Sequence, residues 1–220
     1  MDVECTSRAG FVPANQPVEI LLDAGEHVQI TQPVELTGGA VMATKPVGFM
    51  AGHQCLNVPA DVPGCDHAQQ MIPPAQALGH RYIGVMYPPR RPVETSTRWR
   101  LLGVVFGTKL TYSTNVGGPS HLDQGDVVEL QTGTPFVVSS QDAEHPFLLF
   151  TFMTGADFVE DGYGGADFVL SVSPDRYLRR YVLFADPTYP ETRLVLVRTR
   201  GPDGQFKDVE LSCGGIVQGQ

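Results

Sequence analysis

Two histidines and two cysteines stand in mirror order around a short loop, as His53-Gln54-Cys55 and Cys65-Asp66-His67. Zinc binds two cysteines and two histidines tetrahedrally, so these four side chains are candidate zinc ligands. The spacing is unfavourable, because paired zinc ligands usually lie two to four residues apart on a tight knuckle, and residues at i and i+2 of a strand point to opposite faces. The alternative is that the two histidines bond to backbone groups of the loop.

A disulfide is the other chemistry open to the same two thiols. Cys55 and Cys65 enclose nine residues, which include two prolines and a glycine. A loop this short can close, and closing it would stabilise the fold by about 2–3 kcal/mol. The other two cysteines, Cys5 and Cys213, lie near the two ends of the chain. Because the termini of a domain are often close together, they are candidates to pair with each other, and pairing with a group outside this sequence is equally open.

An acidic, glycine-rich segment is a second candidate metal site. Four carboxylates there offer oxygen ligands of the kind that calcium prefers: Asp157, Glu160, Asp161 and Asp167. Their spacing does not match an EF-hand loop, and residues 155–159 simply repeat as residues 165–169. The alternative is a solvated loop in which aspartates cap turns. No cofactor is expected.

A tryptophan between two arginines, Arg98-Trp99-Arg100, is the candidate binding motif. On a strand, alternation places Trp99 on one face and both arginines on the other, which favours a core tryptophan with outward arginines. If the ring were exposed instead, a tryptophan with flanking arginines would suit a sugar ring or the centre of a protein interface.

Signals for catalysis are weak. The sequence contains no Gly-x-Ser-x-Gly elbow, no phosphate-binding Gly-x-x-x-x-Gly-Lys-Ser/Thr loop and no His-Glu-x-x-His motif. No residue is therefore assigned as catalytic, and the chain is not expected to be an enzyme.

Composition narrows the class of protein further. The 220 residues carry a formal net charge of -9, the wrong sign for a protein that binds a phosphate backbone, so nucleic acid is not an expected partner. No apolar run approaches the ~18 residues of a membrane-spanning helix. The 24 glycines and 18 prolines are scattered between short runs of β-branched and aromatic residues. This pattern predicts an all-β fold.

An internal repeat with an offset of 100 residues organises the chain. Residues 22–30 recur as residues 122–130, with identical Leu, Asp, Gly and Val at four positions, and the strand at 45–50 aligns with 145–150. Pro74 and Leu78 align with Pro174 and Leu178. Several matches in one register indicate a duplicated unit. We expect two tandem β-sandwich-like units, 1–107 with the Cys55–Cys65 loop and 108–220, packed into one fragment.

The sequence resembles a known family, the N-terminal domain of IgGFc-binding protein, which occurs in mucus-type proteins and in large secreted or cell-surface bacterial proteins. The similarity covers about residues 20 to 200 and is most specific around the cysteine loop. It is carried by Lys45-Pro46-Val47, Gly52-His53-Gln54-Cys55, Asn57-Val58-Pro59, Cys65-Asp66-His67, Pro73-Pro74, Tyr82 and Phe152-Met153-Thr154-Gly155. The resemblance implies a secreted, β-rich, non-catalytic module in which Cys55 and Cys65 form a disulfide.

Together these observations predict a non-enzymatic interaction or adhesion module at the cell surface or outside the cell, within a larger, bacterial protein with flanking domains. Its loops would bind a protein or glycan partner. The missing signal peptide does not contradict export if the sequence is a piece of a longer chain. Two alternatives remain: a metal-dependent hydrolytic domain that uses His53, His67 and the acidic segment, and a purely architectural spacer.

Overall fold

The computed structural model describes residues 16–31, 33, 35–159, 164–185, 187–188 and 191–217. The described residues form short strands, one turn of α-helix and two 3₁₀ turns, so the all-β prediction is confirmed. All strand pairs are antiparallel. The strands are β1 (Met50–Leu56), β2 (Asp66–Met71), β3 (Arg81–Gly84), β4 (Thr97–Gly103), β5 (Thr108–Tyr112), β6 (His121–Leu122), β7 (Val127–Thr132), β8 (Phe136–Ser140), β9 (Phe147–Met153), β10 (Asp167–Leu170), β11 (Val209–Leu211) and β12 (Gly215–Val217). The helical turns are α1 (Ala156–Val159), η1 (Ala75–Ala77) and η2 (Pro174–Arg176).

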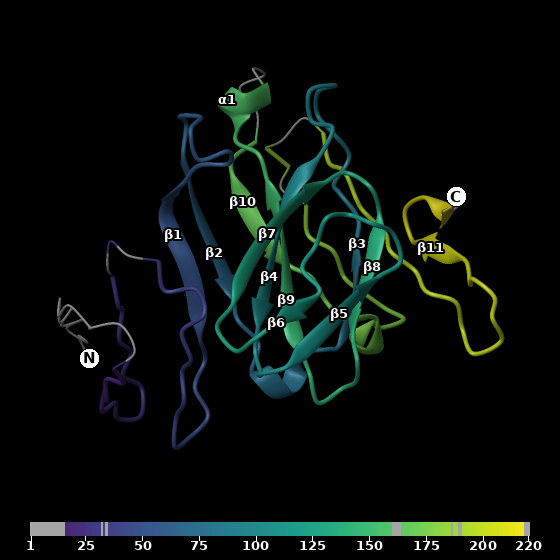
Figure 1. Cartoon of the computed structure of the whole chain (residues 1–220). Coiled ribbons are helices and arrows are strands. Elements are labelled where there is room, and N and C mark those ends of the chain that lie inside the picture. Colours follow the sequence, from purple (N-terminus) through teal and green to yellow (C-terminus); the bar gives the residue numbers. More distant parts are fainter. Residues whose placement is uncertain are drawn as a thin grey trace.

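Two four-stranded sheets enclose the main core (Figure 1). One sheet has the order β10-β9-β4-β7 and the other β3-β8-β5-β6. Residues of β4 alternate between buried and half-buried, as expected for a strand with one face on a core. The core joins both sheets; for example, the rings of Trp99 and Phe136 meet edge to face at 5.2 Å. Its buried members are Tyr82, Trp99, Leu101, Leu110, Leu122, Leu130, Phe136, Val138, Phe147 and Leu149.

Strand β9 is buried on both faces, as its continuous apolar sequence predicts. Phe147 and Leu149 point into the main core, whereas Leu148 and Phe150 belong to a second cluster on the opposite face. That second cluster also contains Val58, from the loop between β1 and β2. The β1–β2 hairpin is therefore attached to the sandwich through apolar packing.

The repeat is visible in the backbone. In both copies a backbone amide donates a hydrogen bond of 3.0 Å to the carbonyl of the aspartate three residues before it. The donor is Glu26 and the acceptor Asp23 in the first copy, and the donor is Asp126 and the acceptor Asp123 in the second. The hairpins β1–β2 and β9–β10 occupy equivalent positions, as do the 3₁₀ turns η1 and η2. Both four-stranded sheets, however, combine strands from either side of residue 107, so the predicted units 1–107 and 108–220 share their sheets.

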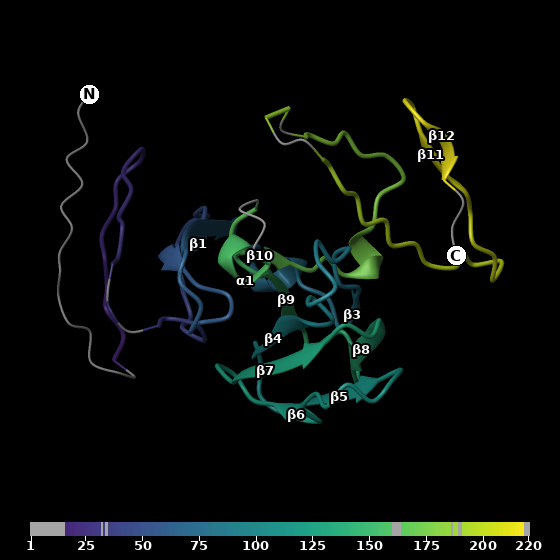
Figure 2. The same ribbon diagram turned by 90° about the horizontal axis from the view of Figure 1, so that it is seen from above.

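Two flanks extend from the sandwich on opposite sides (Figure 2). The N-terminal flank comprises residues 16–49 and the C-terminal flank residues 178–217, apart from the undescribed positions within them. The described residues of the N-terminal flank form no strand, and those of the C-terminal flank form only the small β11–β12 hairpin. Both flanks expose many large apolar side chains.

Candidate interaction surface

Three loops meet at one end of the sandwich, where β9 ends and α1 begins (Figure 1). They are the cysteine loop 57–65, the β3–β4 loop 85–96 and the β9–β10 loop 154–166, of which 160–163 lie outside the described residues. We call these three loops the loop end. Loops positioned by a rigid scaffold are common binding elements, so the contacts that hold them decide what this end can do.

The cysteine loop is closed by a disulfide between Cys55 and Cys65, whose Cα atoms lie 4.9 Å apart. The predicted disulfide is therefore present in the structure. Because both sulfur atoms are bonded to each other, neither is a free thiolate for zinc. His53 instead accepts a hydrogen bond at Nδ1 from the Cys55 amide (3.0 Å), and His67 is exposed.

The cysteine loop and the β9–β10 loop are joined by direct contacts. The Gly155 amide donates to the Val58 carbonyl at 2.9 Å, and Val58 is itself buried. The Ala166 amide donates to the Asp66 carboxylate at 3.2 Å. Gly64, at φ +85°, lies so close to Asp157 that an added Cβ would stand 2.7 Å from the Asp157 carboxylate. These contacts fix one loop against the other.

The candidate calcium ligands do not assemble in the described part of the chain. Asp157 faces Gly64, and Asp167 accepts a hydrogen bond from the Phe168 amide at 2.8 Å, while burial raises the pKa of its carboxyl. Glu160 and Asp161 lie outside the described residues. Among described residues no group of three or more His, Cys, Asp or Glu side chains is placed to hold a metal ion.

A buried carboxylate ties the β3–β4 loop to the end of β9. The Glu94 side chain is fully buried and pairs with the Arg90 guanidinium at 2.9 Å. It also accepts hydrogen bonds from the Arg90 amide (2.6 Å), the Thr154 hydroxyl (2.5 Å) and the Tyr87 hydroxyl (3.0 Å). Burial raises the pKa of Glu94, but these hydrogen bonds outweigh it and lower the pKa to about 2. The carboxylate therefore stays charged and holds the loop in one shape.

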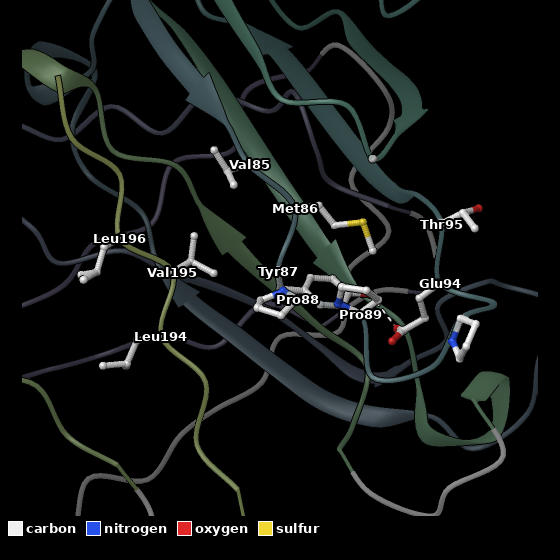
Figure 3. A pocket seen from close by; sticks show the side chains of 12 residues that line it. Val85, Met86, Tyr87, Pro88, Pro89, Glu94, Thr95, Leu194, Val195 and Leu196 are labelled. Carbon is white, nitrogen blue, oxygen red and sulfur yellow. Dashed lines mark hydrogen bonds between the residues drawn. The ribbon is translucent and has the colours of Figure 1, made fainter. Parts of the chain in front are cut away.

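A hollow of about 680 Å³ lies beside this network (Figure 3). The β3–β4 loop forms one wall with Tyr87 and Pro88, and Leu194 and Leu196 of the C-terminal flank form the other. The flank is held there by Arg193, whose guanidinium donates to the Pro89 carbonyl at 2.8 Å. A smaller hollow of about 300 Å³ lies between residues 91–93 on one side and Phe158 and Val159 on the other.

Comparison with known proteins agrees with the sequence resemblance. The profile of the family described as IgGFc binding protein matches residues 1–220. The chain belongs to the IgGFc-binding protein family. The human protein named IgGFc-binding protein is 29% identical over 206 residues, which cover 90% of this chain and 4% of the human one. The chain thus spans a small fraction of that relative's length. No solved structure matches this chain.

The family description names binding and no catalytic activity. Within the described ranges, no helix is long and apolar enough to cross a membrane.

The arginine–tryptophan motif of this family member lies at the start of β4, directly after the β3–β4 loop. Trp99 is 2% exposed and donates from Nε1 to the Thr132 carbonyl at 3.1 Å. Arg98 and Arg100 project from the other face of β4, where both stand over the Phe152 ring. Arg100 also pairs with Glu129 at 2.5 Å and with Glu35. The tryptophan ring is thus a core group and is not displayed on the surface.

Sequence reasoning missed the network around Glu94. The available signal was an Arg90–Glu94 pair at i, i+4 within a proline-rich loop. That spacing is common on exposed surfaces, so it does not reveal that this carboxylate is buried. Of the remaining candidates, Cys213 is exposed and forms no disulfide among the described residues, and Cys5 lies outside them.

Proposed function

We propose that this chain is a non-enzymatic extracellular binding module that engages a protein partner through the loop end. The observation that supports this proposal most directly is the number of separate contacts that hold these loops. The disulfide closes one loop, Glu94 anchors the second, and the Gly155–Val58 hydrogen bond ties the third to the first. A loop surface that is ordered before binding loses little entropy when a partner arrives.

The exposed face of the loop end has the chemistry of a small protein interface. Val93 is 56% exposed and borders the hollow next to Phe158 and Val159. Arg91 and Asp157 are exposed beside it and would form a charged rim. An apolar centre with a polar rim is the usual anatomy of an interface between proteins.

The disulfide supports an extracellular localisation, because disulfides persist in oxidising compartments and are rare in the cytosol. The name of the human relative suggests the partner class, which is the Fc region of immunoglobulin G. We take the Fc fragment as the partner to be tested, with the Fab fragment as the control ligand.

The test compares binding of immobilised Fc by the chain and by two valine variants. Val93→Asp places a charge at the apolar centre of the loop end and should weaken binding at least tenfold. Val172→Asp is the matched control, because Val172 is 54% exposed and lies beyond the opposite end of β10. If both variants bind like the parent chain, the loop end is not the binding surface. If the parent chain binds Fc no better than Fab, Fc is not the partner.

A further inference from the structure

The two flanks expose apolar residues at positions whose repeat counterparts form the main core. Five apolar residues of the N-terminal flank are between 42% and 58% exposed: Leu22, Ile30, Leu36, Val47 and Phe49. One repeat later stand Leu122, Leu130, Phe136, Phe147 and Leu149, all at most 7% exposed. The N-terminal flank therefore carries the apolar set for one half of a core but buries none of it fully.

The C-terminal flank carries the other half. Its segment Thr192-Arg193-Leu194-Val195-Leu196 matches Thr97-Arg98-Trp99-Arg100-Leu101 of β4 at the threonine, the first arginine and the last leucine. Leu194 and Leu196 are 46% and 49% exposed, whereas their β4 counterparts are buried. Upstream, Tyr181 is 68% exposed and corresponds to the buried Tyr82 of β3.

The two flanks correspond to two complementary parts of the central sandwich. In the central sandwich, β3 and β4 supply Tyr82, Trp99 and Leu101, and the chain from β6 to β9 supplies the partners of those strands. The C-terminal flank resembles β3 at Tyr181 and β4 at residues 192–196, with offsets of 99 and 95 residues, and the N-terminal flank resembles the chain from β6 to β9 with an offset of 100. Within one molecule the flanks lie on opposite sides of the sandwich, so they do not complete each other (Figure 2).

We propose that a second copy of this chain completes the missing sandwich, with the C-terminal flank of one copy folding onto the N-terminal flank of the next. The contact is head to tail, and such a contact leaves one flank open at each end of the assembly. Molecules of this chain would therefore form linear arrays in which sandwiches within a chain alternate with sandwiches shared between chains. Burial of the exposed apolar residues is the driving force.

The experiment measures the mass of the full chain by sedimentation velocity over a range of concentrations, in a Cys5→Ser/Cys213→Ser background that prevents disulfide cross-linking. The parent chain should grow beyond a dimer as concentration rises. A variant with Leu194→Asp and Leu196→Asp should stay monomeric, and so should a variant with Val47→Asp and Phe49→Asp. Fluorescence of Trp99, the single tryptophan, reports that the central sandwich stays folded in each.

Two matched control variants test whether any exposed apolar residue matters or only those that correspond to core positions. The first control is Val195→Asp, because Val195 lies between the two altered leucines but corresponds to the outward Arg100. The second is Met42→Asp, because Met42 is 94% exposed and corresponds to the exposed Asp142. Both should associate like the parent chain. The decisive step mixes the two blocked variants, which retain one intact flank each and should form a 1:1 dimer that grows no further. A parent chain that stays monomeric, controls that lose association, or a mixture without the dimer would overturn the proposal.

Discussion

The amide of Ala166 donates a hydrogen bond to the carboxylate of Asp66, two residues that lie one repeat length apart in the sequence. The same two loops also meet through Gly155 and Val58. Equivalent hairpins from successive repeats thus support one another at the loop end, and the disulfide reinforces the hairpin with the less apolar strands. The two copies of the hairpin therefore hold each other in place at the loop end.

Replacing the buried carboxylate should destabilise the fold strongly. Glu94→Gln removes the carboxylate charge beside the largely buried Arg90 guanidinium, and breaking such a pair costs about 3–5 kcal/mol. The free energy of unfolding in urea, followed by Trp99 fluorescence, measures the loss. Glu144→Gln is the control, because Glu144 is exposed, and it should change stability by less than about 0.5 kcal/mol. Equal effects of the two variants would contradict the role given to Glu94.

The same carboxylate should make stability fall in acid. The pKa of Glu94 is about 2 in the folded protein against an ordinary value of 4.5, so the folded state binds this proton less readily than the unfolded state does. Its contribution, about 3 kcal/mol, is therefore complete above about pH 5 and is lost as pH falls toward 2. Urea unfolding at several pH values should show a steeper acid decline for the parent chain than for Glu94→Gln. Parallel profiles would show that Glu94 does not titrate in this way.

Removing the disulfide should loosen the loop end without unfolding the sandwich. The double change Cys55→Ser/Cys65→Ser should lower the free energy of unfolding by about 2–3 kcal/mol, because the unfolded chain regains the freedom of the open loop. Hydrogen exchange should rise at residues 57–65 and at Gly155, whose amide bonds this loop. Reduction of the parent chain should reproduce both effects, whereas reduction of the double variant should do nothing further.

The contact between Gly64 and Asp157 can be separated from backbone strain. Gly64→Ala should cost about 2–4 kcal/mol, because the new Cβ meets the Asp157 carboxylate and the residue also keeps a positive φ. Gly107→Ala, at φ +73° with open space around it, should cost only the strain of about 1 kcal/mol. Adding Asp157→Ala to Gly64→Ala should recover part of the difference in thermal unfolding. An unchanged melting temperature in that double variant would show that the two residues do not press on each other.

Several features followed from short-range patterns in the sequence. Alternation predicted the inward Trp99 with outward arginines, and the continuous apolar run of β9 predicted a strand buried on both faces. The Asp-x-Gly segments at Asp23 and Asp123 are typical of turns, and both have the same backbone hydrogen bond. These features depend on neighbours within a few residues, and such neighbours are written directly in the sequence.

Pairing between distant strands was decided only by the tertiary structure. The sequence indicated a duplicated unit, but it did not show that β3 pairs with β8 or that β4 lies between β7 and β9. Those pairings join residues that are 25 to 58 positions apart, and they place strands from both sides of residue 107 in one sheet.

The sequence by itself determined the β class, the repeat, the paired cysteines and the family. The tertiary structure decided that Glu94 is buried between its own loop and Thr154 at the end of β9, and that apolar residues of the two flanks stay exposed while their counterparts in the central sandwich form the core. The physical reason is that burial depends on what the rest of the chain brings to a residue. Leu22 and Leu122 are followed by similar residues, yet one is 45% exposed and the other fully buried.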